Sequence, residues 1–370
     1  MSRAVLLSRR PDLDRHHGGG ARPRGRASRA RGTGRFLMPD VLTRRNFLSF
    51  DFGDRRAPGD HWIRIHRIAM ACRFEVMLSS EDAGHVGAAR AALDEADAVE
   101  SLLTVFRETS AVADLNRRAA DDDVDVDAGL FTLLVRSHEL HEETDGAFDV
   151  TSTPLSRCWG FLMRQGQLPA DDAVQQARDR VGMPHVHLDP EHQTVRFARR
   201  GMEINFGAIG KGYALDRMAS MLRAGGVRRA LLSAGRSSVV ALGGRGHGWQ
   251  VDLRPRLASR LVGRLWIRDG GVGTSGTGEQ FFEIDGKRYG HVIDPRTGHP
   301  AAGVLGATVV TSDGASADAL STAFFIGGPS LAERYCAGHA DTMAVLVLDD
   351  TTERTQVFGS YHGATLEMES

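Results

Sequence analysis

The stretch INFGAIGKGYALD, residues 204–216, passes from a short apolar run through three glycines around one lysine into helix-like sequence. Where a strand leads through glycines into the start of a helix, the free N–H groups and the helix dipole point at one place. Such a place favours the binding of an anion. The phosphate-loop pattern fails here, because Asn205 and Gly212 stand where it requires Gly and Ser or Thr. By itself the stretch therefore fits either a tight packing turn or a contact to a phosphate or nucleotide.

On both sides of this stretch, the sequence predicts helices and strands of ordinary length. Residues 62–78 partly alternate apolar and polar residues, as a strand or hairpin does, and apolar residues from Val86 to Phe106 recur at helical steps. Further helices are predicted over 128–143, 171–181, 212–226 and 315–327. Further strands are predicted over 194–199, 202–206, 229–243 (two strands around Gly235), 249–254, 264–269, 280–294 (a hairpin at Asp285-Gly286), 306–311 and 342–349. Because no βαβ alternation is sustained, the predicted class is α+β, with largely antiparallel sheets packed with helices.

Composition limits the possible partners. The 46 Lys and Arg residues nearly balance the 47 Asp and Glu residues, so no net field favours a nucleic acid or an anionic membrane. The three cysteines lie far apart and predict neither a disulfide framework nor a Cys-based metal site. No run approaches the roughly 18–20 apolar residues of a membrane span. We therefore expect no nucleic acid partner and no transmembrane span.

The N-terminal segment differs from the rest of the chain. Residues 1–37 are rich in Arg, Gly and His and contain few large apolar residues, so they cannot bury enough surface to offset the cost of ordering. We predict a disordered segment over 1–61, with the true start at Met1 or Met38, and a single catalytic domain over 62–360. The TRRNFLSF stretch at 43–50 resembles a twin-arginine export signal, but FGDRRAPGD follows it in place of an apolar region.

A second candidate motif lies in SDGASADALSTAFFIGG, residues 312–328. Asp318, Ser321 and Thr322 are spaced so that all three project from one face of a helix. A carboxylate beside hydroxyl groups suits a hard cation such as Mg²⁺. The alternative is an Asp near a helix start beside two small packing residues.

Two further stretches contain candidate site residues. His291 lies in YGHVIDPRTGHP, residues 289–300, where it is either a general base at the mouth of a turn or a structural histidine. In GAFDVTSTPLSRCWGF, residues 146–161, a Phe, an Asp and a Trp could surround an aromatic ring or pack in the core.

In their order along the chain, these segments resemble a known family. MACRFEV (70–76), SLLTVFRETSAVADLN (101–116), GAFDVTSTPL, INFGAIGKGYALD, YGHVIDPRTGHP and ADALSTAFFIGG together resemble the ApbE family of FAD:protein FMN transferases over about residues 62–350. The resemblance implies an ApbE-like (T-fold-like) domain and Mg²⁺-dependent transfer of FMN from FAD to a Thr or Ser hydroxyl, with release of AMP. The implied acceptor is a flavoprotein with a D-x-x-[ST]-G-A-T type motif. Alternatives of related chemistry are an FAD pyrophosphatase that yields FMN and AMP, and a catalytically inactive FAD-binding protein.

The resemblance also implies roles for individual residues. The implied Mg²⁺ ligands are the Ala208 carbonyl, Asp318, Ser321 and Thr322. The implied FAD contacts are Met70, Phe106, Ala147, Phe148, Asp149, Asn205, Lys211 and Ile293. Among these, Phe106 and Phe148 are expected to stack on a ring. His291 is the expected base that deprotonates the acceptor hydroxyl.

Some positions depart from the family pattern. Asn205 stands where many relatives have Asp, and Gly235-Arg236-Ser237 replaces the usual Gly-Gly-Asp or Gly-Gly-Asn. The DGGVGTSG stretch at 269–276 lacks the Ala of the acceptor motif, so we do not expect self-flavinylation. The resemblance favours a periplasmic or membrane-associated protein, whereas a twin-arginine-like segment that is not a working signal would leave the protein cytoplasmic.

Overall fold

The computed structural model describes residues 61–244, 246–254, 261–277 and 280–369, together with the backbone of two short strands, β1 (Arg35–Phe36) and β2 (Leu48–Ser49). The disorder predicted for 1–61 and the twin-arginine-like segment fall almost entirely outside the described residues and stay predictions. Within the described ranges, no helix is both long and apolar enough to cross a membrane.

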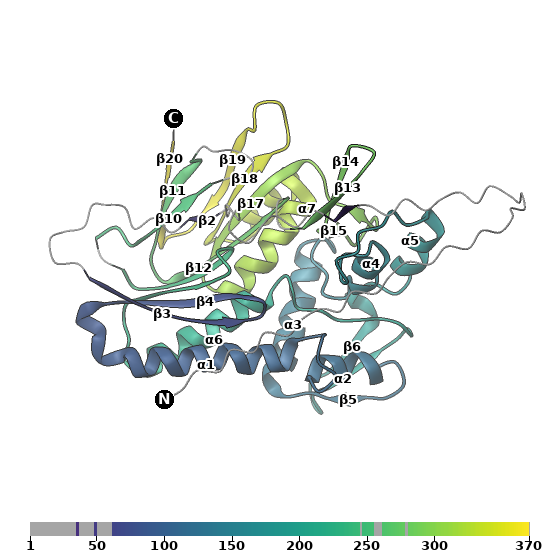
Figure 1. The fold of residues 1–370 in the computed structure, drawn as a ribbon, viewed down its shortest axis with the longest axis horizontal. Helices are drawn as coiled ribbons and strands as arrows, with labels where there is room; N and C mark the ends of the chain where they lie inside the picture. The colour runs from purple at the N-terminus through teal and green to yellow at the C-terminus, as the bar shows by residue number, and fades with distance from the viewer. Residues whose placement is uncertain are drawn as a thin grey trace, which may run out of the picture. The chain divides into compact units, whose positions relative to one another are not determined.

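An eight-stranded sheet forms the centre of the structure (Figure 1), in the order β19-β18-β17-β12-β9-β8-β4-β3. All neighbouring strands in it are antiparallel. Its strands are β3 (Trp62–Ala69), β4 (Cys72–Ser79), β8 (Ala230–Ala234), β9 (Ser238–Leu242), β12 (Gly270–Gly276), β17 (Val304–Thr311), β18 (Thr342–Leu348) and β19 (Thr355–Ser360). The antiparallel α+β class predicted from the sequence is confirmed.

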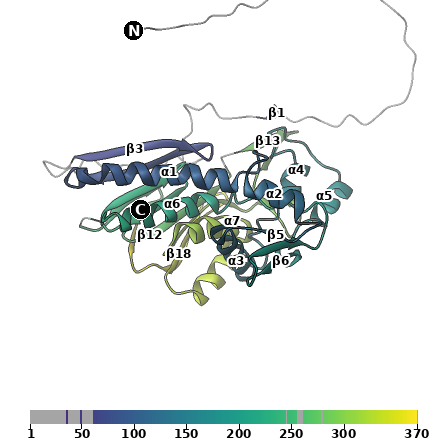
Figure 2. The ribbon, with the colours of Figure 1, turned by 90° about the horizontal axis from the view of Figure 1, so that it is seen from below.

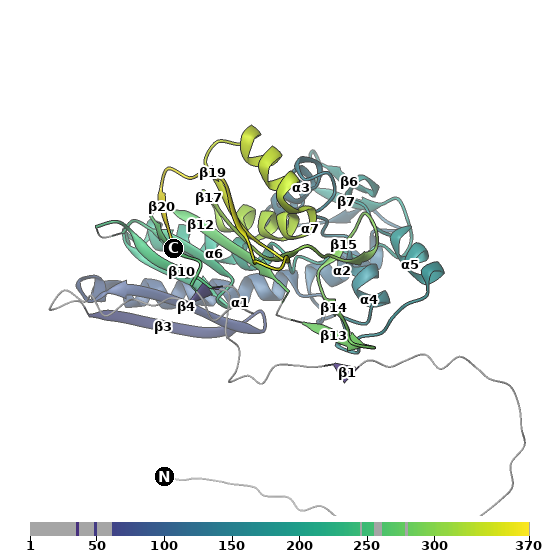
Figure 3. The same ribbon diagram turned by 90° about the horizontal axis from the view of Figure 1, so that it is seen from above.

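Each face of this sheet buries its own set of apolar side chains, because side chains alternate along a strand. One face packs against three helices, α1 (Val86–Leu103), α6 (Gly210–Ala224) and α7 (Gly314–Gly338), and α1 and α6 lie side by side (Figure 2). The opposite face packs against a four-stranded sheet, β2-β10-β11-β20 (Figure 3), and the apolar side chains between the two sheets come from β4, β8, β9, β12, β17 and β18 on one side and from β10 and β11 on the other. This second sheet contains β10 (Trp249–Leu253), β11 (Gly263–Ile267) and β20 (Ala364–Met368).

The remaining elements form a third region beside α7. Its helices are α2 (Ala111–Arg118), α3 (Ala128–Glu143), α4 (Thr153–Cys158) and α5 (Asp171–Arg178), with a short 3₁₀ helix at Met183–His185. A second 3₁₀ helix, Ser80–His85, lies outside this region and leads into α1. The strands of the third region are β5 (Val124–Asp125), β6 (Val186–Asp189), β7 (Thr194–Phe197), β13 (Phe281–Ile284), β14 (Lys287–Gly290), β15 (Ile293–Asp294) and β16 (His299–Pro300). Trp159, Phe161 and Phe282 form the centre of a separate aromatic core beneath α4 and the β13–β14 hairpin.

The strand predicted over 202–206 is wrong. Within this segment Glu203 makes an isolated bridge to Ser152, and the strands that pair with β7 are β5 and β6. Ile204 instead exchanges two hydrogen bonds with the side chain of Asn116, at 2.7 and 2.9 Å. The Asn116 amide therefore satisfies the backbone groups that a neighbouring strand would otherwise pair with, while Ile204 stays buried.

Two predicted helix boundaries also need correction. Helix α1 ends at Leu103, so Phe106 lies in the following loop and not on the helix. Helix α7 continues beyond residue 327, although Gly328 has a φ of 68° and Pro329 follows it. A left-handed residue before a proline interrupts the hydrogen-bond ladder, so α7 consists of two helical parts joined at a kink. The strands β19 and β20 were not predicted.

Candidate functional site

A cavity of about 380 Å³ lies where the start of α6, β12 and α7 meet α4, the 204–209 loop and the base of the β13–β14 hairpin. All predicted site residues except Met70 line it, from segments that are far apart in the sequence. A cavity of this size is within the usual range for small-molecule sites. The structure thus brings the separate sequence motifs together, while the role of each residue stays a prediction.

The first wall of the cavity presents oxygen atoms. Asp318 is only 5% exposed, and its Oδ2 accepts a 2.7 Å hydrogen bond from the backbone N–H of Gly212. The Ser275 Oγ lies 2.9 Å from the Ser321 Oγ and 3.0 Å from the Thr322 Oγ1. Ser275 was not predicted as a site residue, because its hydroxyl partners lie on a helix more than forty residues away.

The donor set on this wall fits a hard cation. Among the residues that the structure describes, no group of three or more His, Cys, Asp or Glu side chains could hold a metal ion. The wall instead combines one buried carboxylate with three hydroxyl groups, and Mg²⁺ takes few protein oxygens while it keeps water and phosphate as its other ligands. Asp318, Ser321, Thr322 and the carbonyl of Ala208 would hold such an ion.

The backbone of α7 is pressed against α6 and β12 at this wall. A Cβ atom added to Gly212 would lie 2.0 Å from the carbonyl oxygen of Gly314, and one added to Gly273 would lie 2.2 Å from that of Ala317. Only glycine allows backbones to approach so closely. The glycine in the KGY sequence therefore serves helix packing, and the lysine before it is held at a fixed place in the cavity wall.

Two carboxylates cap the start of α7. Asp216 on α6 accepts hydrogen bonds from the backbone N–H groups of Gly314 and Ala315, at 2.7 and 2.9 Å, and Asp313 accepts one from Ser316 at 2.7 Å. Burial and the negative charge of Asp313 raise the pKa of Asp216 to about 7, even though the two helix N–H groups favour its charged form. Asp216 was not predicted as a site residue.

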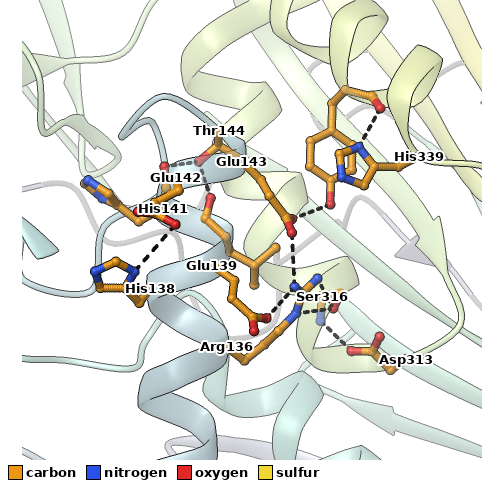
Figure 4. Close-up of polar contacts among 12 residues, drawn as sticks. Arg136, His138, Glu139, His141, Glu142, Glu143, Thr144, Asp313, Ser316 and His339 are labelled. Atoms are coloured by element: carbon orange, nitrogen blue, oxygen red, sulfur yellow. Dashed lines mark hydrogen bonds and ion pairs between the residues drawn. The ribbon is translucent and has the colours of Figure 1, made fainter. Parts of the chain in front are cut away.

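A polar network joins α3 to both parts of α7 (Figure 4). The guanidinium of Arg136 on α3 donates to the Glu139 Oε2 at 3.0 Å and to the Glu143 Oε1 at 3.4 Å. It also donates to the Ser316 Oγ at 3.3 Å. The Tyr335 hydroxyl donates to the other oxygen of Glu143 at 2.9 Å. Burial and this carboxylate raise the pKa of Tyr335 above its ordinary value, so the hydroxyl keeps its proton.

Asn205, in the loop before α6, and Lys211, in the first turn of α6, both line the cavity. The Lys211 Nζ donates to the Ser237 Oγ. The Asn205 Oδ1 accepts a 2.9 Å hydrogen bond from the N–H of Gly207, which shapes the turn as Asp would also do. Arg236 is exposed, has a φ of 64° and does not line the cavity. Of the three residues that depart from the family pattern, Ser237 therefore contacts the site through Lys211, whereas Arg236 makes no contact that assigns it a role in the cavity.

The two phenylalanines predicted to stack on a ring lie in opposite environments. Phe106 is 72% exposed in the loop after α1, so its ring is available to a ligand. Phe148 is 1% exposed and belongs to the main core, which leaves little ring surface for stacking. Met70 lies in the β3–β4 turn with a φ of 48°, and its methyl group packs near Gly210 outside the cavity lining.

Asp149 is held by protein groups on several sides. Its Oδ1 accepts hydrogen bonds from the N–H and the hydroxyl of Thr151, at 2.7 and 2.5 Å, and its Oδ2 lies 3.2 Å from the His141 Nδ1. Burial lowers the pKa of His141, but the hydrogen bond and charge of Asp149 outweigh burial and raise this pKa above its ordinary value. The pair fixes the 147–151 turn behind the cavity.

His291 lies at the base of the β13–β14 hairpin. Its Nδ1 is 3.2 Å from the carbonyl oxygen of Gln280, and its backbone N–H donates to the same oxygen at 3.1 Å. A carbonyl can only accept, so the neutral imidazole carries its proton on Nδ1 and has its lone pair on Nε2. That tautomer suits a general base.

By fold and site, this is an α+β protein with an antiparallel eight-stranded sheet and a cavity lined by a buried carboxylate, hydroxyls, a lysine and a histidine. The family model described as "ApbE family" matches residues 70–347, and the chain belongs to this family.

Relatives with assigned names agree with the family. The chain is 35% identical over 260 residues to the FAD:protein FMN transferase of Treponema pallidum. This match covers 64% of this chain and 70% of the relative. The fold of the chain is similar to the ApbE protein of Thermotoga maritima, with a TM-score of 0.74, 27% identity, and coverage of 80% of this chain and 97% of that one. The flavinyl transferase ApbE of Pseudomonas stutzeri matches with a TM-score of 0.68 and 28% identity, and the match covers 81% of this chain and 95% of that one.

Proposed function

We propose that the protein is an FAD:protein FMN transferase that moves the FMN part of FAD onto a Thr or Ser hydroxyl of a target flavoprotein and releases AMP. The observation that carries the proposal is the convergence of the predicted FAD and metal residues on one cavity, although they come from five separate segments of the chain. The names of the relatives support the same reaction.

The reaction breaks one phosphoanhydride bond, between the two phosphates of FAD, and forms one phosphoester bond to the acceptor. The acceptor hydroxyl oxygen bonds to the phosphorus of the FMN part, the bond from that phosphorus to the AMP phosphate oxygen breaks, and the hydroxyl proton leaves. His291 would take this proton on Nε2, since its Nδ1 faces the Gln280 carbonyl. Lys211, at the N-terminal end of α6, would offset the charge that builds on the phosphate oxygens.

Magnesium fits the oxygen donors on the first wall. Asp318, Ser321, Thr322 and the Ala208 carbonyl would hold Mg²⁺, which supplies charge stabilisation at the phosphates when it is bound. What supports this assignment is the donor set itself, because Asp318, Ser321 and Thr322 line the same cavity and a carboxylate beside hydroxyl groups suits a hard cation.

One experiment tests the reaction. The purified protein is incubated with FAD, Mg²⁺ and an acceptor domain that carries a D-x-x-[ST]-G-A-T motif, and the acceptor is analysed by mass spectrometry. We expect a mass gain of one FMN on the motif hydroxyl, with AMP in solution and no gain when that Thr is replaced by Ala.

Other outcomes separate the related activities. Free FMN and AMP without a modified acceptor would identify an FAD pyrophosphatase. Tight FAD binding without either product would identify an FAD-binding protein without catalysis. A protein that binds no FAD in the presence of Mg²⁺ would contradict all three functions.

A further inference from the structure

We propose that Asp216 is a positioning residue that holds the Asp318 carboxylate in the cavity wall by tying α6 to α7. This inference rests on the proposed function, because it assigns Asp216 a purpose in metal binding. Asp216 does not line the cavity, so any effect it has on the site is indirect and acts through the packing of α6 against α7.

The two helices exchange hydrogen bonds in both directions. Asp216 on α6 accepts from the N–H groups of Gly314 and Ala315 on α7, at 2.7 and 2.9 Å. Asp318 on α7 accepts from the N–H of Gly212 on α6, at 2.7 Å. In both helices the paired positions are about one turn apart, so the contacts form two cross-links between the same turns.

Close packing prevents the helices from shifting between these cross-links. A Cβ on Gly212 would lie 2.0 Å from the Gly314 carbonyl oxygen, and a Cβ on Gly314 would lie 3.2 Å from the Asp216 Oδ1. The contact is therefore made by main-chain atoms and one short side chain. Loss of the Asp216 cross-link would let the first turn of α7 move, and Asp318 lies in the next turn.

Asp313 provides a matched comparison. It caps the same end of α7 through a 2.7 Å hydrogen bond from the N–H of Ser316 (Figure 4), but it belongs to the loop directly before that helix. Loss of the Asp313 cap removes a carboxylate from the helix end without breaking the link to α6. An ordinary capping role predicts the same result for both residues, whereas a positioning role predicts different results.

The experiment compares Asp216→Asn with Asp313→Asn in the full chain. Mn²⁺, which prefers the same oxygen ligands as Mg²⁺, is titrated by electron paramagnetic resonance in the presence of FAD and without acceptor, so that no turnover occurs. Thermal unfolding is measured on the same samples. We expect Asp216→Asn to weaken Mn²⁺ binding about tenfold or more, as for other residues that orient metal ligands. We expect Asp313→Asn to lower the Tm while Mn²⁺ affinity stays within about twofold of the wild type, since a side chain that caps only its own helix acts mainly on helix stability.

Each result has one meaning. Equal Mn²⁺ affinity for Asp216→Asn and the wild type, or equal weakening in both variants, would overturn the inference and leave the proposed function intact. A wild-type protein that binds FAD but no Mn²⁺ would contradict the metal assignment of the proposed function itself. If Asp216→Asn does not fold, Asp216→Glu keeps the charge but lengthens the cross-link, and the same loss of Mn²⁺ affinity is expected for it.

Discussion

The two walls of the cavity are built in different ways. The wall formed by α6, α7 and β12 consists of backbones in contact, with Asp318 and Ser321 buried and the hydroxyls of Ser275 and Thr322 half-buried beside them. The opposite wall is formed by side chains from the 104–107 loop, α4 and the hairpin base, and it includes the highly exposed Phe106. The first wall leaves almost no freedom of movement, which suits atoms that must be placed for bond exchange. The second can adapt to a ligand.

The largest effect is expected for the carboxylate of the packed wall. Asp318→Ala removes the only charged group among the predicted metal ligands, so FMN transfer should fall by at least about a hundredfold, as when one transition-state contact is lost. Turnover is measured across a range of Mg²⁺ concentrations. Transfer within tenfold of the wild type at saturating Mg²⁺ would remove Asp318 from the metal site.

The packed wall should also be intolerant of one added methyl group. Gly212→Ala places a Cβ 2.0 Å from the Gly314 carbonyl oxygen, and overpacking of this kind costs about 3 kcal/mol of unfolding free energy. Urea unfolding measures the loss. Gly87→Ala is the control, because its Cβ in helix α1 would meet nothing within 4 Å, and it should be neutral or stabilising. Equal stability of the two variants would mean that the wall is not closely packed at Gly212.

The adaptable wall should affect substrate binding and leave stability unchanged. Phe106→Ala should raise the KM for FAD about fivefold, which corresponds to about 1 kcal/mol for one aromatic contact, with little change in kcat or Tm. Met163→Ala is a matched control, since Met163 is 62% exposed but does not line the cavity. An unchanged KM for Phe106→Ala would show that the exposed ring has another purpose.

The smallest effect concerns the support behind the adaptable wall. Since Asp149 raises the pKa of His141 in the folded protein, the charged pair stabilises fully below pH 6.5, and this stabilisation is lost as the pH rises through the folded-state pKa. The stability advantage of the wild type over His141→Gln should therefore be larger at pH 6 than at pH 8. Urea unfolding at both values measures it. A constant or growing advantage with rising pH would contradict the assigned direction of the pKa.

The spacing of apolar residues along the chain predicted the helices and strands that bury one face. It failed where the side chain of a distant residue, and not a neighbouring strand, bonds the backbone. The hairpin over 62–79, helix α1 and the pair β8–β9 follow from local alternation and helical spacing. The 202–206 segment has the same alternation, but Asn116 rather than another strand satisfies its backbone. The signal that separates these cases is a tertiary contact, which no window of local sequence contains.

The site residues also divide into those that local spacing predicts and those that only tertiary contacts reveal. Asp318, Ser321 and Thr322 share one helix face, so their spacing alone placed them together. Ser275 and Asp216 join the site only through contacts to residues about fifty and one hundred positions away, at 2.9 Å to Ser321 and 2.7 Å to Gly314. Their residue types are too common to attract attention without those partners.

The contact between Gly212 and Gly314 also limits how such sequences can diverge. Where two side chains collide, a smaller residue on either side can relieve the clash, but here the opposing atom is a main-chain oxygen that every residue type carries. No second substitution at Gly314 can therefore compensate for a larger residue at Gly212. Asp216 must also reach the same turn of α7. Insertions or deletions between residues 212 and 216 should therefore be excluded, so the length of this segment should stay constant in any chain that keeps the site.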